Sequence, residues 1–434
     1  MFTRRAKYLV WKIEDSYHLF PRPFWVLMAG SFIDRVGAAL VFPFLSLYVT
    51  QKFHVGVIEV GKMFFIFAVA SFIGELLAGA LTDRFGRKVM IVFGLLCAAI
   101  NSTLMGLVND LALFYAVAAV VGMLADMGGP ARQAIIADLL PREKVADGYG
   151  MSRVVYNAAV VIGPVLGGVL AVTTGYFTLF LLDAITSVIM AVIVVAALPE
   201  TRPEAREDER RESFWQTLAG YRLVARDRLY MAFLGIALVI QVVYIQMNTT
   251  LAVYLLNAHG ITPDLFGIIL SLNATMVVLF QFGITRRIAR RPPLLMLALG
   301  AALYGIGFAL YGLVSTFFLM LVAMAIITLG EMVHVPVQQA VVANLAPEDM
   351  RGRYMAMMGF SWIIPFALGP LAAGAIMDSG AANWVWYGGG LVCAAAVAAC
   401  YGLHLIAGSR FQPGLAGQPG EVVAPREPLA AAAD

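Results

Sequence analysis

Twelve apolar stretches, each long enough to cross a bilayer, dominate the sequence. A membrane-spanning helix needs about 20 mostly apolar residues. Hydrophobic residues make up 61% of the 434 residues and charged residues only 13%, which leaves too little polar surface for a soluble protein. We therefore predict an all-α polytopic membrane protein with twelve transmembrane helices, and we exclude a soluble enzyme and a disordered chain. The predicted spans are 24–49, 57–80, 89–108, 111–137, 148–171, 176–198, 229–256, 265–285, 294–314, 317–343, 353–377 and 383–406.

The positions of the lysines and arginines orient these spans. The connections after the second, fourth, sixth, eighth and tenth spans all contain basic residues. The connections after the third, fifth, seventh, ninth and eleventh spans contain none. Because basic loops favour the cytoplasmic side, we predict a multi-pass protein of a prokaryotic plasma (inner) membrane with both termini in the cytoplasm.

The chain divides into two related halves. Residues 130–168 align without gaps to residues 336–374 at an offset of 206, and the same offset pairs Gly61 with Gly267. Parallel repeats around an axis along the membrane normal are typical of transporters. The predicted organisation is a cytoplasmic N-terminal segment (1–23), two six-helix bundles (24–198 and 229–406), a cytoplasmic inter-bundle linker (199–228) and a disordered cytoplasmic tail (407–434).

The loop after the second span carries the motif Gly79-Ala-Leu-Thr-Asp83-Arg84-Phe-Gly86-Arg87-Lys88. Its glycines permit close helix approach and a tight turn. Arg87 can pair with a carboxylate such as Asp138 at the end of the fourth span. Anchoring by positive charge alone accounts for Arg84 and Lys88, but it does not account for Asp83.

This motif is similar to the signature loop of the major facilitator superfamily, and the resemblance covers about residues 24–406. It implies the major facilitator fold, in which two pseudo-symmetric six-helix bundles work by alternating access. It also implies that the loop and Asp138 form a cytoplasmic gate, which latches the two halves in the outward-facing state. The corresponding loop of the second half, 283–291, keeps the positive charge but has no Asp.

The fifth span contains Gly163-Pro164-Val-Leu-Gly167-Gly168, which resembles a motif that antiporters of this superfamily carry there. In physical terms, the proline removes a backbone hydrogen bond and the glycines let a neighbouring helix pack closely. The upstream glycine pattern of the motif is missing. Plain helix packing therefore stays open as an alternative to antiport.

The tenth span contains Thr328-Leu-Gly-Glu331, which resembles a stretch of the proton-driven multidrug exporters in which the Glu lies in the membrane. A carboxyl group in a low dielectric takes up a proton more readily than in water, so Glu331 is the leading candidate proton carrier. His334 shares its helix face, either as a relay member or as an ordinary interior histidine. Those exporters often carry an acid near the position of Asn248, where an amide cannot take up a proton.

Further ionisable residues lie within the predicted spans, where a charged side chain costs about 2.5–3.5 kcal/mol. Such residues should face the cavity or pair with one another. Asp34 and Arg35 are adjacent, so they point about 100° apart on a helix and cannot share a face. For each residue a structural bond is the alternative to a role in coupling or substrate binding. The set comprises Asp34, Arg35, Glu75 with its repeat partner Gln281, Asp126, Arg153 and Asp183.

We predict a secondary active transporter, not an enzyme, that exports small amphipathic, cationic compounds in exchange for protons. Its partners would be the small-molecule substrate, protons and the bilayer, without nucleic acid, and we expect a monomer. A proton gradient would drive it without a cofactor, and no metal-ligand spacing is present. One alternative is a proton-coupled symporter or facilitator for a metabolite, sugar or lysolipid, with Arg35 or Arg153 binding an anionic or polar substrate. The other is a non-transporting receptor or membrane enzyme.

Overall fold

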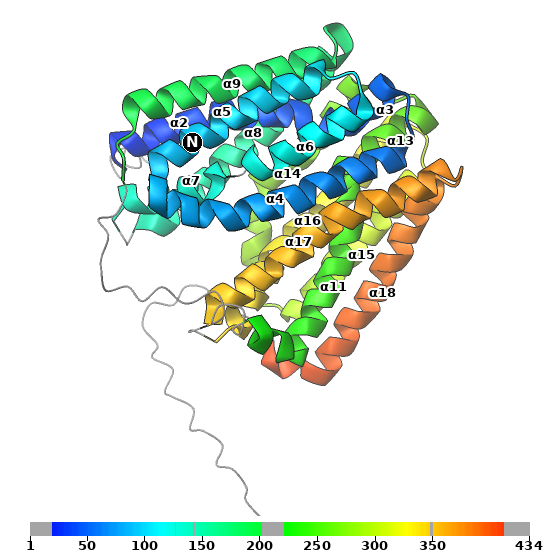
Figure 1. Cartoon of the computed structure of the whole chain (residues 1–434). Helices are drawn as coiled ribbons and strands as arrows, with labels where there is room; N and C mark the ends of the chain where they lie inside the picture. The colour runs from blue at the N-terminus through cyan, green and yellow to red at the C-terminus, as the bar shows by residue number, and fades with distance from the viewer. Residues whose placement is uncertain (1–19, 126, 142–143, 202–220, 348–349, 412–434) are drawn as a thin grey trace, which may run out of the picture.

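The computed structural model describes residues 20–125, 127–141, 144–201, 221–347 and 350–411, and this part of the chain is helical without strands. Twelve of its helices or helix pairs are long and apolar enough to cross a membrane. The twelve predicted spans are therefore confirmed. The helices of the two halves form two groups, which meet at one end and diverge at the other (Figure 1).

The first half contains six spans, and glycine or proline interrupts two of them. Pro43 breaks the first span into two α-helices joined by a short 3-10 turn. The fourth span is divided just before the sequence Gly128-Gly-Pro130. The bounds are α2 (Arg22–Val41), η1 (Phe42–Phe44), α3 (Leu45–Phe53), α4 (Val57–Phe85), α5 (Arg87–Leu107), α6 (Leu111–Ala125), α7 (Gly128–Leu139), α8 (Val145–Thr173) and α9 (Tyr176–Ala197).

The second half repeats this arrangement. Its first span is again broken in three, although no proline stands at the break. The side chains of Gln246, Thr249 and Thr250 hydrogen-bond to the backbone and to one another there instead. The bounds are α11 (Arg228–Tyr244), α12 (Gln246–Thr249), α13 (Leu251–His259), α14 (Pro263–Ile288), α15 (Pro293–Tyr311), α16 (Phe317–Leu345), α17 (Arg351–Asp378), α18 (Asn383–Ala407) and η4 (Gly408–Arg410).

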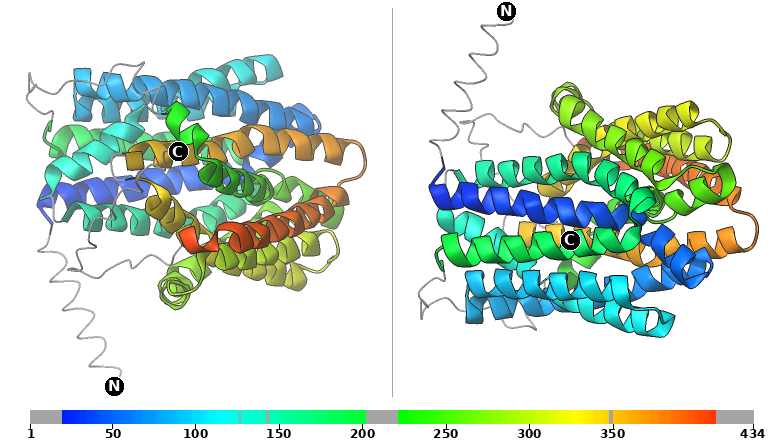
Figure 2. Two further views of the ribbon diagram at one scale, coloured as in Figure 1. Left: turned by 90° about the horizontal axis from the view of Figure 1, so that it is seen from below. Right: turned by 90° about the horizontal axis from the view of Figure 1, so that it is seen from above.

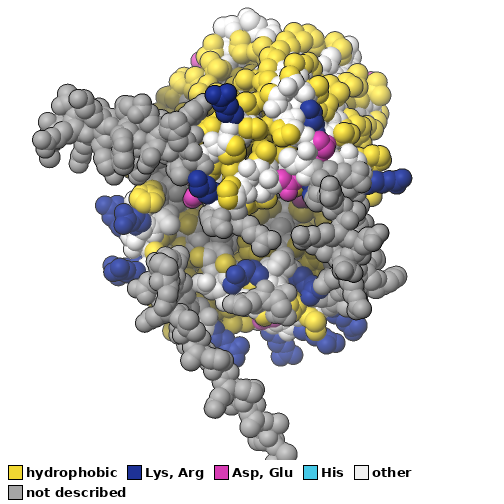
Figure 3. Space-filling view, turned by 90° about the vertical axis from the view of Figure 1, so that its left-hand side faces the viewer, with side chains coloured by type: hydrophobic (Ala, Val, Ile, Leu, Met, Phe, Trp, Pro, Cys, Tyr) yellow, Lys and Arg dark blue, Asp and Glu magenta, His cyan; other side chains and the backbone are white. Residues whose placement is uncertain are grey.

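We call the end of the molecule that carries the even-numbered loops the basic face and the other end the opposite face. Figure 3 looks onto the basic face, around which Lys and Arg side chains are distributed. Each half has its own hydrophobic cluster toward this face: one contains Phe24 and Met190, and the other contains Tyr230 and Val342. The largest cluster lies toward the opposite face and takes residues from both halves, from Leu40 to Trp386. The shared core therefore joins the halves toward the opposite face, and Figure 2 shows the same helices from two further sides.

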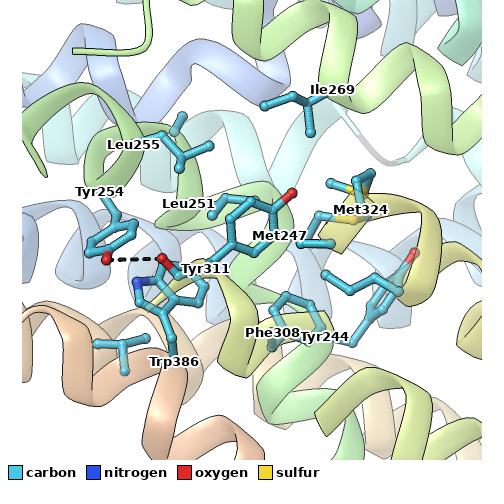
Figure 4. Packing of buried hydrophobic residues seen from close by; sticks show 14 of the residues in the cluster. Tyr244, Met247, Leu251, Tyr254, Leu255, Ile269, Phe308, Tyr311, Met324 and Trp386 are labelled. Carbon is cyan, nitrogen blue, oxygen red and sulfur yellow. Dashed lines mark hydrogen bonds between the residues drawn. The ribbon is translucent and has the colours of Figure 1, made fainter. Parts of the chain in front are cut away.

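Aromatic side chains dominate the part of this shared core that lies in the second half (Figure 4). Trp386 is 1% exposed and its ring lies 4.9 Å from that of Tyr254 and 5.9 Å from that of Tyr311. The Tyr254 hydroxyl lies within hydrogen-bond distance of two acceptors, Asn383 Oδ1 at 2.8 Å and the Tyr311 carbonyl at 3.2 Å. These contacts fix α13, α15 and α18 relative to one another.

Two helix pairs, α4 with α17 and α8 with α14, form the contact between the halves. Glycines let their backbones approach closely. A Cβ atom at Gly61 would lie 2.6 Å from Leu371 Cα, and one at Gly374 would lie 2.7 Å from Ile58 Cα. Both distances are far shorter than an ordinary van der Waals contact. A larger residue at either position would therefore push α4 and α17 apart.

Several residues outside the predicted bundles are also ordered. The last bundle is predicted to end at 406, but α18 continues to Ala407, and Phe411 is 5% exposed and packs near Phe233. Within the predicted linker, Val224 is buried in the same cluster. An apolar side chain next to a bundle gains from burial even within a polar or Pro/Gly-rich stretch. Most of residues 1–23, and the centre of the linker, lie outside the described residues.

Candidate functional site

A cavity of about 940 Å³ lies within the first half, between the basic-face portions of α2, α4, α7 and α8. Arg35, Glu75, Arg132 and Arg153 are among its lining residues, together with the Tyr156 ring. The guanidinium of Arg35 lies 5.8 Å from the centre of that ring. The cavity therefore combines an excess of positive charge with one carboxylate.

Asp34 points away from this cavity and into the bundle. It is 8% exposed and accepts hydrogen bonds from Arg132 Nη1 at 2.8 Å and from the Ser187 hydroxyl at 3.0 Å. The pair joins α2 to α7, and Ser187 joins both to α9. Asp34 and Arg35 thus separate as the helical periodicity predicts, one into an ion pair and the other toward the cavity.

Glu75 and its repeat partner Gln281 have different surroundings. Glu75 is exposed and lines the cavity. Its repeat partner Gln281 instead donates hydrogen bonds to the Met332 carbonyl and to Thr285, which ties α14 to α16. The structure therefore places Gln281 in a helix contact. Asp126 lies outside the described residues.

A second, smaller cavity of about 150 Å³ lies in the same half, toward the opposite face. Asp183 lines it and accepts a hydrogen bond of 2.7 Å from the Ser102 hydroxyl. No lysine or arginine forms an ion pair with Asp183 among the described residues. Asp34 lies on α2 and Asp183 lies on α9, and these two helices pack against each other.

In the second half, Glu331 of α16 is surrounded by uncharged partners. Its Oε2 atom accepts a hydrogen bond of 2.8 Å from Asn273 of α14, and Tyr244 of α11 lies nearby. His334 is 2% exposed and its imidazole lies 5.7 Å from the Tyr304 ring. Neither imidazole nitrogen has a hydrogen-bond partner among the described residues, so no relay from Glu331 to His334 is formed. Asn248 lies in α12, at the break of its span.

The loop motif after the second span forms a compact cluster on the basic face. Gly86 ends α4 with φ of 96°, a conformation that favours glycine. Arg87 Nε donates to Asp138 at 3.2 Å, which is the pairing that the sequence suggests. The Lys88 ammonium donates to two carbonyls near the end of α9. Arg84 lies against the adjacent Phe85 ring, Gly79 lies within α4, and the side chain of Asp83 lies outside the described part of the chain.

Glu200 completes this cluster, although no sequence motif points to it. Its carboxylate accepts the backbone N–H of Arg87 at 2.8 Å and that of Lys88 at 3.2 Å. It therefore caps the N-terminus of α5 with a negative charge, where the helix dipole favours one. These contacts of the motif all lie within the first half of the chain.

The motif in the fifth span acts as a packing surface on two sides. Cβ atoms at Gly163 and Gly167 would meet the backbone of α2, at Ala39 and Leu40. Gly168 faces the start of α14 in the other half, and the Pro164 carbonyl lies against Gly267. The motif therefore holds α8 between its own bundle and the opposite one.

The two halves are also joined by polar contacts at the opposite face. Asp378, at the end of α17, accepts the backbone N–H of Val57 at 2.8 Å and that of Ile58 at 2.9 Å. It caps α4 from the other half. The Ser46 hydroxyl of α3 donates to the Thr249 carbonyl of α12, so that the two broken spans touch at their breaks.

Arg132, Asp378 and Glu200 are therefore the residues that sequence reasoning missed. A basic residue inside the predicted span 111–137 was the signal for Arg132. No local signal marks Asp378 or Glu200, because their partners are backbone groups of distant helices. Within the described residues, no group of three or more His, Cys, Asp or Glu side chains is arranged to hold a metal ion.

Two repeated six-span halves that meet at one face, with ionisable side chains buried inside each half, define a polytopic membrane transporter rather than an enzyme. Comparison with known proteins gives the particular family. The profile described as the Major Facilitator Superfamily matches residues 27–362 and 247–429. The chain belongs to the Major Facilitator Superfamily.

Relatives with curated descriptions are transporters of the same kind. A "Na(+), Li(+), K(+)/H(+) antiporter" of Planococcus maritimus is 28% identical, and the match covers 83% of this chain and 90% of the relative. The "Multidrug resistance protein MdtG" of Dickeya zeae is 35% identical over 38% of this chain and 41% of its own length. "Multidrug resistance protein 2" of Bacillus subtilis is 28% identical over a similar share, 38% and 42%.

Solved structures share the fold at low identity. The nucleoside transporter NupG (D323A mutant) superposes with a TM-score of 0.76 at 13% identity, over 88% of this chain and all of its own. A POT family transporter in complex with 5-aminolevulinic acid gives a TM-score of 0.74 at 14% identity, over 90% of this chain and 97% of its own. At this identity the likeness shows the fold alone.

Proposed function

We propose that this protein is a proton-coupled exporter of small, amphipathic, cationic compounds, which works by alternating access. The basic face is taken as cytoplasmic by the positive-inside rule. In the described conformation the halves would then be closed toward the outside and open toward the cytoplasm. Exchange of a substrate for protons requires carboxyl groups that change charge inside the membrane.

The environment of Glu331 is the observation that carries this proposal. Its carboxylate accepts a hydrogen bond from an amide, and no basic side chain pairs with it among the described residues. A half-buried carboxylate inside a membrane span without a basic partner is costly, and proton binding is the usual way to remove that cost. A positively charged substrate bound beside Glu331 would remove it equally well. Substrate and proton would therefore compete for Glu331.

In the first half, Asp34 is held in an ion pair with Arg132, which also lines the large cavity. The antiporter and multidrug descriptions of relatives favour exchange and organic substrates, respectively.

The test is accumulation of a fluorescent lipophilic cation in cells that express the wild type or Glu331→Gln, with and without a protonophore. The amide keeps a hydrogen-bonding group near Asn273 but cannot exchange a proton. We expect the wild type to lower accumulation, the protonophore to abolish this effect, and Glu331→Gln to lose it at equal membrane abundance.

Glu59→Gln is the matched control, since Glu59 is a carboxylate near the opposite face that already pairs with Lys62 at 2.6 Å. It should export normally. Export by Glu331→Gln at the wild-type rate would contradict the assignment of the proton carrier. A wild type that changes the accumulation of no dye would contradict export of amphipathic cations.

A second candidate is a proton-coupled symporter for an anionic or polar metabolite, because Arg35 and Arg153 line the large cavity. It predicts that an inward proton gradient raises the accumulation of such a metabolite in proteoliposomes. It also predicts that Arg35→Gln abolishes this uptake. We further propose that the protein acts as a monomer in a prokaryotic plasma membrane, with both termini in the cytoplasm and without a cofactor.

A further inference from the structure

The 150 Å³ cavity of the first half has a size that suits one compact chemical group. It lies between α2, η1, α4, α5, α6 and α9. A cavity of this volume in a protein core holds a molecule the size of benzene. A trimethylammonium group has similar dimensions, whereas the 940 Å³ cavity near the basic face is several times larger.

The polar side of this cavity contains the Asp183 carboxylate, the Ser102 hydroxyl and the Asn101 side chain. The Ser102 hydroxyl donates a hydrogen bond of 2.7 Å to Asp183. No lysine or arginine forms an ion pair with Asp183 among the described residues. A cavity lined by a carboxylate without a basic partner is electrostatically suited to a positive charge.

The remaining walls are aromatic and aliphatic. Phe42, Phe64, Phe67 and Phe180 line the cavity with methionines and small aliphatic residues. Aromatic rings attract a cation through their faces, and recognition of alkylated ammonium groups by aromatic cages is the best known use of this interaction.

One side chain of the other half covers this aromatic wall. Phe366 of α17 lies 5.3 Å from Phe64, 6.3 Å from Phe42 and 6.3 Å from Phe67, measured between ring centres. Rotation of the halves relative to each other would therefore move Phe366 away from the other three rings. Access to the cavity is thus connected with the alternation of the two halves.

We propose that this cavity is a subsite for the alkylated ammonium head of a substrate, with Asp183 as the counter-charge and the phenylalanine rings that line it as the walls, against which Phe366 of the other half packs. The inference rests on the proposed export of cations and names the part of the substrate that is recognised. An aromatic or aliphatic tail would extend from the subsite into the space between the halves. The opposing explanation is that Asp183 only bonds α9 to α5 through Ser102.

Binding to the purified protein in nanodiscs tests the proposal without transport. The probe is benzyltrimethylammonium, and its dissociation constant is measured by ligand-observed NMR titration. We expect Asp183→Asn to weaken binding by at least tenfold, because the amide keeps an acceptor for Ser102 but removes the charge. Phe366→Leu should weaken it about two- to fivefold, since leucine keeps the bulk but lacks the ring face.

Two further measurements separate charge and space from loss of folding. Ala118→Val narrows the cavity without changing its charge and should also weaken binding, while thermal unfolding of each variant checks that it is folded. Choline should compete with the probe, and its neutral isostere 3,3-dimethyl-1-butanol should not. Unchanged binding in folded Asp183→Asn, or equal competition by the neutral isostere or by Na⁺, would overturn the subsite.

The same variants distinguish this inference from the proposed function. If Asp183→Asn exports trimethylammonium-bearing dyes with unchanged KM and kcat, the subsite is wrong while export stands. If the wild type exports no cation but binds the probe in a manner that depends on Asp183, the subsite is supported and the export proposal fails.

Discussion

The contact of Asp378 with the start of α4 predicts a measurable bias between the two conformations of the transporter. Both carboxylate oxygens accept backbone N–H groups of α4, at 2.8 and 2.9 Å, from a helix of the other half. The contact exists only while the opposite face is closed. Its removal therefore destabilises that conformation and leaves the conformation open at the opposite face unaffected.

The magnitude follows from the kind of bond that is lost. Loss of an N-terminal cap costs about 0.5–2 kcal/mol, and one of these two bonds is solvent-exposed. We therefore expect about 1 kcal/mol for Asp378→Ala, which is roughly a fivefold change in the ratio of the two conformations. Asp378→Asn should have a smaller effect, because asparagine also caps helices but carries no charge for the helix dipole.

The assay is the distance distribution between spin labels at Thr174 and Ser315, measured by electron–electron double resonance in a background without the native cysteines. Both positions are exposed loop residues on the opposite face, one in each half. Asp378→Ala should increase the long-distance population about fivefold. Asp110→Ala is the control, since Asp110 caps α6 within its own half, where it accepts the N–H of Leu113. An unchanged distribution in Asp378→Ala, or an equal change in Asp110→Ala, would refute the reasoning.

Three further outcomes follow from the contacts described above. Arg132→Ala should lower the free energy of unfolding in detergent by up to about 3 kcal/mol, because it leaves the Asp34 carboxylate buried without its charge partner. Adding Asp34→Asn should restore part of this loss, which a double-mutant cycle measures. Gly374→Leu should prevent α17 from reaching α4, so cysteine labelling from the outside should increase at the opposite face while membrane abundance is kept. Trp386→Ala should lower the free energy of unfolding by about 3–5 kcal/mol. Trp386→Phe should lower it far less, because the buried indole N–H has no hydrogen-bond partner to lose among the described residues.

The spans could be predicted because hydrophobic length leaves few alternatives. The fourth-span break lies next to a Gly-Gly-Pro sequence, and Pro43 marks the break in the first span. No comparable signal marks the break in the seventh span. There, the hydroxyls of Thr249 and Thr250 hydrogen-bond to groups about one helical turn away in the chain. Threonines with the same bonds elsewhere in a helix would leave that helix unbroken. Local bonding of this kind depends on packing that the sequence does not display.

The candidate site could be predicted in part. A carboxylate inside a span must be paired or functional, so Asp34, Asp183 and Glu331 could be selected by type. Their partners could not be selected, because Arg132 is 98 residues from Asp34 along the chain and Asn273 is 58 residues from Glu331. The contact of Arg87 with Asp138 could be predicted, because Arg87 belongs to a recognisable motif and Asp138 lies at the predicted end of the fourth span. The roles of all these residues in coupling stay predictions.

The distribution of the hydrophobic clusters has a consequence for how the protein is made. The cluster that contains Phe24 and Met190 uses residues of the first half only, from Phe20 to Leu198. It can therefore be complete while the ribosome is still synthesising the second half, as N-terminal domains often are. The shared cluster needs Trp386 of the last span as well as Leu40 of the first. Assembly in the membrane must therefore end with the joining of the halves. A chain truncated before the last span would retain one finished bundle, whose apolar contact surface for the other half stays uncovered. Proteases and chaperones of the membrane would recognise such a surface.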